Sequence, residues 1–202
     1  MKKGFIGIYH PSVVLTCAGL GFTVAGIGAA FSGGISAAMI LLVLAALCDM
    51  FDGVVARRFK RTDREKAFGI QIDSIVDVCS FGVFPVCLLF QLAGQGIVTC
   101  VVAILYAIGA VERLAWFNIT TEENPDRFVG LPVIYSALAL PLVYLLGLYL
   151  PAAVMPWLWR GSYLLMAVLF VTGFETKKPS LAFRLGMLLV AVGIIVALCV
   201  LP

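Results

Sequence analysis

Charge is scarce in this chain: only 12% of its 202 residues are charged, whereas 62% are hydrophobic. A soluble domain of this length carries about twice that charged fraction. The composition therefore excludes an ordinary soluble protein and predicts a polytopic membrane protein. Long polar stretches are also missing, which predicts a single domain over residues 1–202. The formal net charge of +3 is too small to indicate nucleic-acid binding.

Metal-type cysteine pairs are missing as well. The chain has six cysteines, all in apolar segments, and none of them forms a Cys-x-x-Cys pair. Cysteine in such surroundings usually behaves as a small hydrophobic side chain. We therefore expect the cysteines to pack inside or between helices rather than to bind zinc.

What the chain does have is a series of long apolar runs. About twenty apolar residues cross the hydrocarbon core of a bilayer as a helix. We predict an all-α transmembrane bundle of about seven spans, within a range of six to eight. The run that follows Pro11 is expected to be a retained first span rather than a cleaved signal. The expected spans are 12–32, 35–57, 69–91, 96–117, 130–149, 154–173 and 181–201.

Basic residues predict the orientation of these spans. Lys2 and Lys3 precede the first span, and a basic cluster separates the second span from the third. Because cytoplasmic loops carry an excess of lysine and arginine, the N-terminus and the 58–68 loop are expected in the cytoplasm. This orientation predicts a multi-pass protein of the inner, cytoplasmic membrane. An alternative role for the cluster is contact with anionic lipid. The cluster consists of Arg57, Arg58, Lys60, Arg61, Arg64 and Lys66.

Four of the eleven acidic residues lie in two of the apolar segments. The first segment reads Asp49-x-x-Asp52-Gly53-x-x-Ala56-Arg57, and the second reads Gly69-x-x-x-Asp73-x-x-x-Asp77. Four carboxylates in membrane helices would cost roughly 10 kcal/mol on insertion scales. Each pair shares one helix face, because residues three or four apart are neighbours on a helix. Since the two spans run in opposite directions, both pairs are expected at a similar depth near the cytoplasmic side.

Carboxylates that converge from two helices form an all-oxygen site. Such a site suits Mg²⁺ or Mn²⁺, whereas zinc would recruit histidine or cysteine. Four negative charges suit two divalent ions, which can clamp both sides of a phosphoryl displacement. Arg57 would add a fixed cation for a phosphate. Two alternatives are helix-end acids that pair with the basic loop, and a divalent-cation transporter whose carboxylates line a path.

The combined pattern from Asp49 to Asp77 resembles the signature of the CDP-alcohol phosphatidyltransferases. That family usually has eight or nine residues between the arginine and the second glycine, whereas residues 58–68 number eleven here. The resemblance implies CDP-diacylglycerol as donor, two divalent metal ions, release of CMP and a homodimer. The implied metal ligands are Asp49, Asp52 and Asp73, with Asp77 on the second ion and also acting as general base. The implied nucleotide-binding residues are Asp52, Gly53, Ala56, Arg57 and Gly69.

Three further segments resemble the phosphatidylserine synthase branch of that family. They are Ser80–Pro85, Arg113–Asn118 and Gly130–Pro132. The resemblance implies transfer of the phosphatidyl group to L-serine, with glycerol phosphate, an inositol phosphate or another alcohol as alternative acceptors. One departure is Trp116, which stands where that branch commonly has a second arginine.

Taken on their own, a few residues after the acidic pattern fit a small zwitterionic acceptor. Arg113 could hold a carboxylate, Asn118 could hydrogen-bond it, and Glu112 could meet an ammonium. Ser80 lies one turn beyond the last aspartate and is a further candidate. Each has a structural alternative: a snorkelling cation for Arg113, and helix-end or backbone hydrogen bonding for Asn118 and Ser80.

Overall fold

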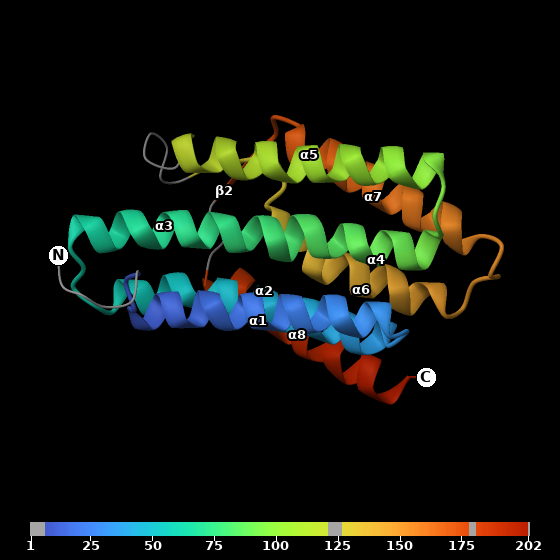
Figure 1. The fold of residues 1–202 in the computed structure, drawn as a ribbon, viewed down its shortest axis with the longest axis horizontal. Coiled ribbons are helices and arrows are strands. Elements are labelled where there is room, and N and C mark those ends of the chain that lie inside the picture. Colours follow the sequence, from blue (N-terminus) through green and yellow to red (C-terminus); the bar gives the residue numbers. More distant parts are fainter. Residues whose placement is uncertain (1–6, 121–126, 178–180, 202) are drawn as a thin grey trace.

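The computed structural model describes residues 7–120, 127–177 and 181–201 as a bundle of helices (Figure 1). Lys2 and Lys3, which contribute to the predicted orientation, lie outside these residues. The helices are α1 Pro11–Phe31, α2 Ile35–Arg57, α3 Asp63–Asp77, α4 Phe84–Ala93, α5 Ile97–Thr120, α6 Ser136–Gly147, α7 Met155–Val171 and α8 Leu181–Val200. A π-helical segment, η1 Val78–Val83, joins α3 to α4, and a 3-10 turn, η2 Val133–Tyr135, precedes α6.

The predicted helical bundle is confirmed, and a helix lies in each of the seven expected regions. Five helical segments of the described chain are long and apolar enough to cross a membrane, including the continuous helix Asp63–Ala93. The regions expected at 130–149 and 154–173 form the shorter apolar helices Val133–Gly147 and Met155–Val171. The chain is therefore a multi-pass membrane protein by the length and composition of its helices.

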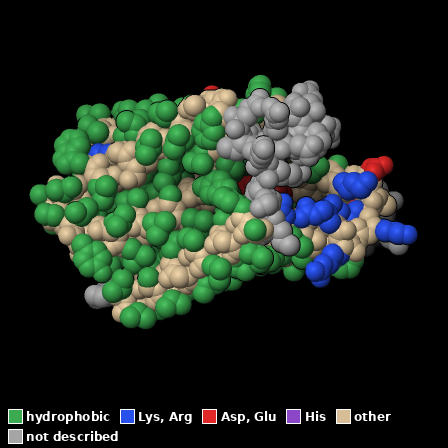
Figure 2. Space-filling view, turned by 180° about the vertical axis from the view of Figure 1, so that it is seen from behind, with side chains coloured by type: hydrophobic (Ala, Val, Ile, Leu, Met, Phe, Trp, Pro, Cys, Tyr) green, Lys and Arg blue, Asp and Glu red, His purple; other side chains and the backbone are tan. Residues whose placement is uncertain are grey.

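Hydrophobic side chains cover most of the face seen in Figure 2, and basic side chains gather at one end of the molecule. That end contains the beginning of α3, where Thr62 forms a capping box with Glu65. The cap satisfies backbone N–H groups at the helix start, so α3 begins with a fixed direction. Arg58, Lys60 and Arg64 are exposed in this region.

The long helix that carries two of the aspartates passes through Pro85 without breaking. Proline has no N–H, so the carbonyl of Phe81 loses its usual helical partner. The hydroxyl of Tyr106 on α5 donates a hydrogen bond to that carbonyl at 2.8 Å. The wider π-turn Val78–Val83 accommodates the irregularity directly after Asp77. The carbonyl that Pro85 leaves without a helical partner therefore binds Tyr106, and this hydrogen bond holds α5 against the helix next to the acidic residues.

A short antiparallel pair of strands departs from the all-α prediction. β1 Arg127–Val129 pairs with β2 Glu175–Lys177. The pairing arises because Gly130, with φ of 74°, and Pro132 interrupt helix formation before α6. The N–H of Gly130 donates to the carbonyl of Phe174 at 2.9 Å, which holds this turn against the chain that follows α7. The turn lies beside Arg113, whose Cδ would be 3.5 Å from a Cβ at Gly130.

Candidate active site

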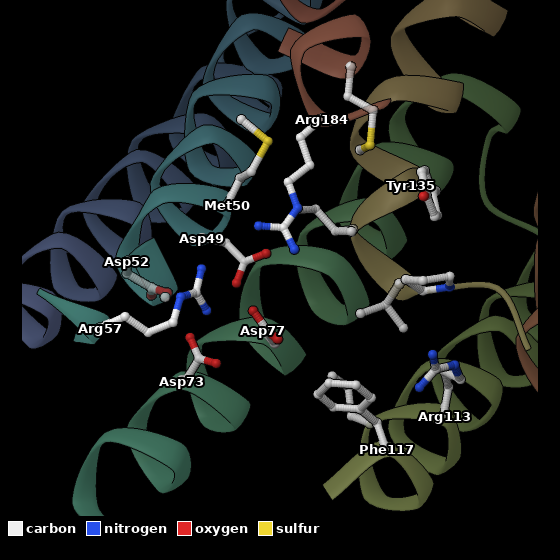
Figure 3. Close-up of a pocket in the computed structure, with 16 residues that line it drawn as sticks. Asp49, Met50, Asp52, Arg57, Asp73, Asp77, Arg113, Phe117, Tyr135 and Arg184 are labelled. Carbon is white, nitrogen blue, oxygen red and sulfur yellow. The ribbon is translucent and has the colours of Figure 1, made fainter. Parts of the chain in front are cut away.

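The main cavity, of about 310 Å³, lies where α2, α3, α5, η2 and α8 meet. Its aspartates come from α2 and α3, and two of its arginines come from α5 and α8 (Figure 3). Packing of α8 against α2 and α6 brings the last helix next to the acidic residues. Apolar side chains complete the lining, among them Met50, Leu114 and Val133.

The structure brings all four predicted metal ligands, Asp49, Asp52, Asp73 and Asp77, into this cavity. One carboxylate oxygen each of Asp49, Asp52 and Asp73 lies within 4.8 Å of the others. The side chain of Asp77 faces Asp49, and that of Asp73 faces Asp52 (Figure 3). The antiparallel arrangement of α2 and α3 thus places both acidic pairs at the same depth, as their spacing predicts.

The hydrogen bonds around the aspartates leave acceptor capacity free. Thr16 on α1 donates from Oγ1 to Oδ2 of Asp52 at 2.6 Å, which fixes one carboxylate. Oδ1 of Asp73 is buried and has no hydrogen-bond partner among the described residues. Within the same described ranges, the ion pair found joins Lys66 to Asp63 and involves none of the four cavity aspartates. Pairing with the basic loop therefore does not explain the cluster there.

A divalent cation fits this group of side chains. Close carboxylates repel one another in surroundings of low dielectric unless a positive charge lies between them. The donors are all hard carboxylate oxygens, and one of them is buried and unpartnered. Mg²⁺ and Mn²⁺ prefer such oxygens. Asp49, Asp52 and Asp73 are consequently able to hold a divalent ion.

Two of the predicted nucleotide-binding positions lie beneath arginine guanidinium groups. Nη1 of Arg57 would be 3.7 Å from a Cβ at Gly53, and Nη1 of Arg61 would be 3.5 Å from a Cβ at Gly69. Gly53 and Arg57 line the main cavity, whereas Gly69 and the buried Ala56 are outside its lining. The absence of side chains at both glycines lets guanidinium groups approach the backbone closely.

Arg113 is the acceptor-site candidate that the structure places in the main cavity. Its side chain is only 5% exposed, and its guanidinium lies 5.4 Å from the centre of the Phe117 ring. Nε of Arg113 has no hydrogen-bond partner in the described parts of the chain. A buried guanidinium without a carboxylate partner is costly, so this position indicates an anionic ligand.

The other three acceptor-site candidates lie elsewhere. Ser80 is buried and shares a 2.6 Å hydrogen bond with Thr23, behind the aspartates. Glu112 lines a second cavity, of about 300 Å³, on the other side of Arg113. Nδ2 of Asn118 donates to Oγ of Ser74 at 2.8 Å, which joins α5 to α3.

Sequence reasoning misses three polar residues at the site: Thr16, Tyr135 and Arg184. Tyr135 and Arg184 line the main cavity, and Thr16 supports Asp52. A cation at the start of an apolar helix, as Arg184 is, gives a faint signal, but the same pattern marks an ordinary helix end. Thr16 gives no signal, because threonine in a membrane helix often bonds only to its own backbone. Here its Oγ1 also lies 3.1 Å from the carbonyl oxygen of Ser12, so its single proton is shared between that carbonyl and the closer Asp52.

Comparison with known proteins adds independent information. The family model for CDP-alcohol phosphatidyltransferase matches residues 9–173. The archaetidylserine synthase of Methanothermobacter thermautotrophicus is 38% identical over 118 residues, which cover 58% of this chain and 50% of that protein. The CDP-diacylglycerol–serine O-phosphatidyltransferase of Helicobacter pylori strain 26695 is 37% identical over 109 residues, covering 52% and 45%. The protein of that name from Mycobacterium tuberculosis strain CDC 1551 is 33% identical over 153 residues, covering 70% and 52%. The chain spans about half the length of these curated relatives.

Proposed function

This chain belongs to the CDP-alcohol phosphatidyltransferase family, and on that premise we propose that it transfers the phosphatidyl group of CDP-diacylglycerol to the hydroxyl of L-serine. The products are phosphatidylserine and CMP. The observation that carries the proposal is one cavity that joins four aspartates to a buried arginine, Arg113, whose Nε has no hydrogen-bond partner among the described residues. The aspartates suit a metal-assisted phosphoryl transfer, and the arginine suits an acceptor that carries an anion.

The donor, CDP-diacylglycerol, would contact the protein through its diphosphate and its cytidine, and the membrane through its two acyl chains. Arg57, at the edge of the cavity, offers a bidentate contact to a phosphate. We propose that the cytidine lies toward Gly53, Ala56 and Gly69, where arginine guanidinium groups lie close to the backbone of the two glycines. The acyl chains would remain among the hydrophobic side chains that surround the bundle.

Asp77 is the residue that we assign as general base. It lines the main cavity with Asp49 and Asp73, so a bound acceptor hydroxyl can reach it there. Asp77 removes the proton of the serine hydroxyl, whose oxygen forms a bond to the phosphorus attached to diacylglycerol. The bond from that phosphorus to the oxygen of CMP breaks, and CMP leaves with the electron pair.

Two Mg²⁺ or Mn²⁺ ions held by the four aspartates would supply charge neutralisation for the diphosphate and the leaving group. The protein itself contributes position: Thr16 fixes the carboxylate of Asp52, and Tyr106 fixes the helix after Asp77. Such positioning lowers the activation barrier because the entropy cost of bringing the reacting groups together has already been met on binding. Arg113 would hold the serine carboxylate from the opposite side.

The basic end of the molecule supports an active site that faces the cytoplasm. Exposed arginines and lysines at the start of α3 lie at the same end of α2 and α3 as the aspartates. Under the positive-inside rule this end faces the cytoplasm of a bacterial-type inner membrane. The homodimer implied by the family resemblance stays a prediction.

An acceptor panel tests the proposed function. Purified protein in mixed micelles receives CDP-diacylglycerol labelled in its phosphatidyl part, with serine, glycerol phosphate, inositol phosphate or no acceptor. We expect labelled phosphatidylserine and an equal amount of CMP with serine, and only when Mg²⁺ or Mn²⁺ is present. A product with glycerol phosphate and none with serine would refute the serine assignment. Divalent-ion flux into proteoliposomes without lipid substrate would instead favour a transporter.

A further inference from the structure

The last helix, α8, contributes an arginine to the main cavity although it lies beyond the residues that match the family model. That match ends at residue 173, whereas α8 spans Leu181–Val200. Arg184 lies in the first turn of α8 and lines the cavity together with Met187 one turn later. Figure 3 shows the Arg184 side chain reaching down from α8 with its guanidinium toward Asp49. The helix is therefore part of the wall of the site.

Arg184 and Arg113 approach the cavity from different helices. Arg113 comes from α5 and Arg184 from α8, and Tyr135 lines the wall between α5 and α8 (Figure 3). In the described parts of the chain, neither arginine forms an ion pair with a carboxylate. A planar guanidinium suits bidentate contact with a carboxylate or phosphate. Two such groups facing one cavity indicate a ligand with an anionic group between them.

The formal charges of the side chains that line the cavity favour one further anionic group there. Four aspartates carry four negative charges, which two divalent ions would balance. Three arginines then remain in the lining: Arg57, Arg113 and Arg184. The diphosphate of the donor brings two negative charges, so one positive charge remains for the acceptor. A carboxylate supplies the matching single negative charge.

We propose that Arg184 is a specificity-determining residue that binds the carboxylate of the acceptor jointly with Arg113. The inference deepens the proposed function and rests on it. In this arrangement the carboxylate lies between the two guanidinium groups, with Arg184 on the side of Asp49 and Arg113 across the cavity. The hydroxyl of the same small acceptor is then left to face Asp77. An alcohol without an anionic group would use neither arginine.

The test compares serine with two acceptors that lack the carboxylate, ethanolamine and L-serinamide. Arg184→Ala and Arg184→Lys are assayed with the full-length protein in mixed micelles at saturating Mg²⁺. We expect Arg184→Ala to raise the KM for serine about 10–100-fold, the range for loss of a hydrogen bond to a charged group. The kcat and the KM for CDP-diacylglycerol stay within about twofold. Arg184→Lys recovers part of the affinity because it restores the charge without the planar fork.

The turnover of ethanolamine and serinamide is expected to stay the same in Arg184→Ala, so the preference for serine falls. Leu185→Ala is the matched control, since Leu185 is the next residue of α8 and is exposed; its KM for serine should equal that of the wild type. An unchanged KM for serine in Arg184→Ala overturns the inference. So does an equal loss for all three acceptors, or an increase in the KM for CDP-diacylglycerol alone.

The outcome separates the inference from the proposed function. If the wild-type protein makes no phosphatidylserine, the proposed function fails before any variant is measured. If the wild type makes it and Arg184→Ala retains the wild-type KM for serine, only the role of Arg184 fails. If Arg184→Ala is poorly folded, Arg184→Lys still tests the inference. A contact between Arg184 and the carboxylate requires that Arg184→Lys raise the KM for serine and leave the turnover of ethanolamine unchanged.

Discussion

The two sides of the main cavity are built differently. Its acidic side comes from α2 and α3, which follow each other in the chain, and all four carboxylates fall between Asp49 and Asp77. Its basic side combines Arg113 of α5 with Arg184 of α8, which are separated by two further helices and the strand pair. The acidic side fits the chemistry of phosphoryl transfer, and the basic side fits the choice of acceptor. In the proposed function, reaction and specificity therefore depend on different kinds of structure: local sequence spacing for the reaction and long-range packing for the specificity.

The largest expected effect on activity comes from replacing Asp77, the proposed general base on the acidic side of the cavity. Asp77→Asn keeps the size of the side chain but removes its ability to accept a proton. We expect kcat to fall by about 10²–10⁴, the usual contribution of a general base, while CDP-diacylglycerol still binds. Initial rates of CMP release and a binding assay with the labelled lipid measure the two quantities. Asp63→Asn is the control, because Asp63 is an exposed acid of the same helix that pairs with Lys66. Near-normal turnover of Asp77→Asn would remove Asp77 from this role.

A smaller effect is expected when the support of the acidic side is removed. Thr16→Val deletes the 2.6 Å hydrogen bond to Asp52 and leaves the four carboxylates in place. Loss of a group that orients a metal ligand typically lowers metal affinity about 10–100-fold. The Mg²⁺ concentration for half-maximal activity should rise by that factor, with little change in kcat at saturating Mg²⁺. Thr23→Val provides the comparison, since Thr23 lies on the same helix and bonds to Ser80 instead. Equal Mg²⁺ requirements in the two variants would contradict the role of Thr16.

The basic side should respond through acceptor affinity. Arg113→Lys retains a positive charge but loses the planar group that can contact both oxygens of a carboxylate. We expect the KM for serine to rise about tenfold, which corresponds to one hydrogen bond to a charged group, with an unchanged Mg²⁺ requirement. Steady-state kinetics with serine and Mg²⁺ varied separately measure both. A change confined to the Mg²⁺ requirement would show that the two sides are not separate in function.

The smallest effect on activity is expected at Ser80, which sequence reasoning includes among the acceptor-site candidates. Its hydrogen bond to Thr23 is buried behind the aspartates, so Ser80→Ala should reduce stability by about 1 kcal/mol. The KM for serine should stay the same. Thermal unfolding in detergent and acceptor kinetics give the two readings. A higher KM for serine without loss of stability would return Ser80 to the acceptor site.

The sequence predicts the helices and the acidic side well, because both depend on short-range periodicity. Residues three or four apart share a helix face wherever the helix packs, so Asp49 can be assigned with Asp52, and Asp73 with Asp77. The strand pair and the contribution of Arg184 depend on how distant segments pack, which no local pattern encodes. Trp116 shows why local patterns do not predict such packing. It stands where an arginine is common in the family branch, yet it lines the second cavity. The additional arginine of the main cavity comes from α8 instead.

The π-turn after Asp77 determines how the part of the helix that carries Asp73 and Asp77 is rotated relative to α4. An α-helix turns by about 100° per residue, so one residue more or less changes which side faces a neighbour. Phe84 and Leu88 beyond the turn are fully buried in the core, and Tyr106 is hydrogen-bonded to the carbonyl of Phe81 within it. Those contacts hold the α4 part of the helix in place. Deletion of a single residue from Val78–Val83 would therefore rotate Asp73 and Asp77 by about 100° relative to α4 and turn them away from α2.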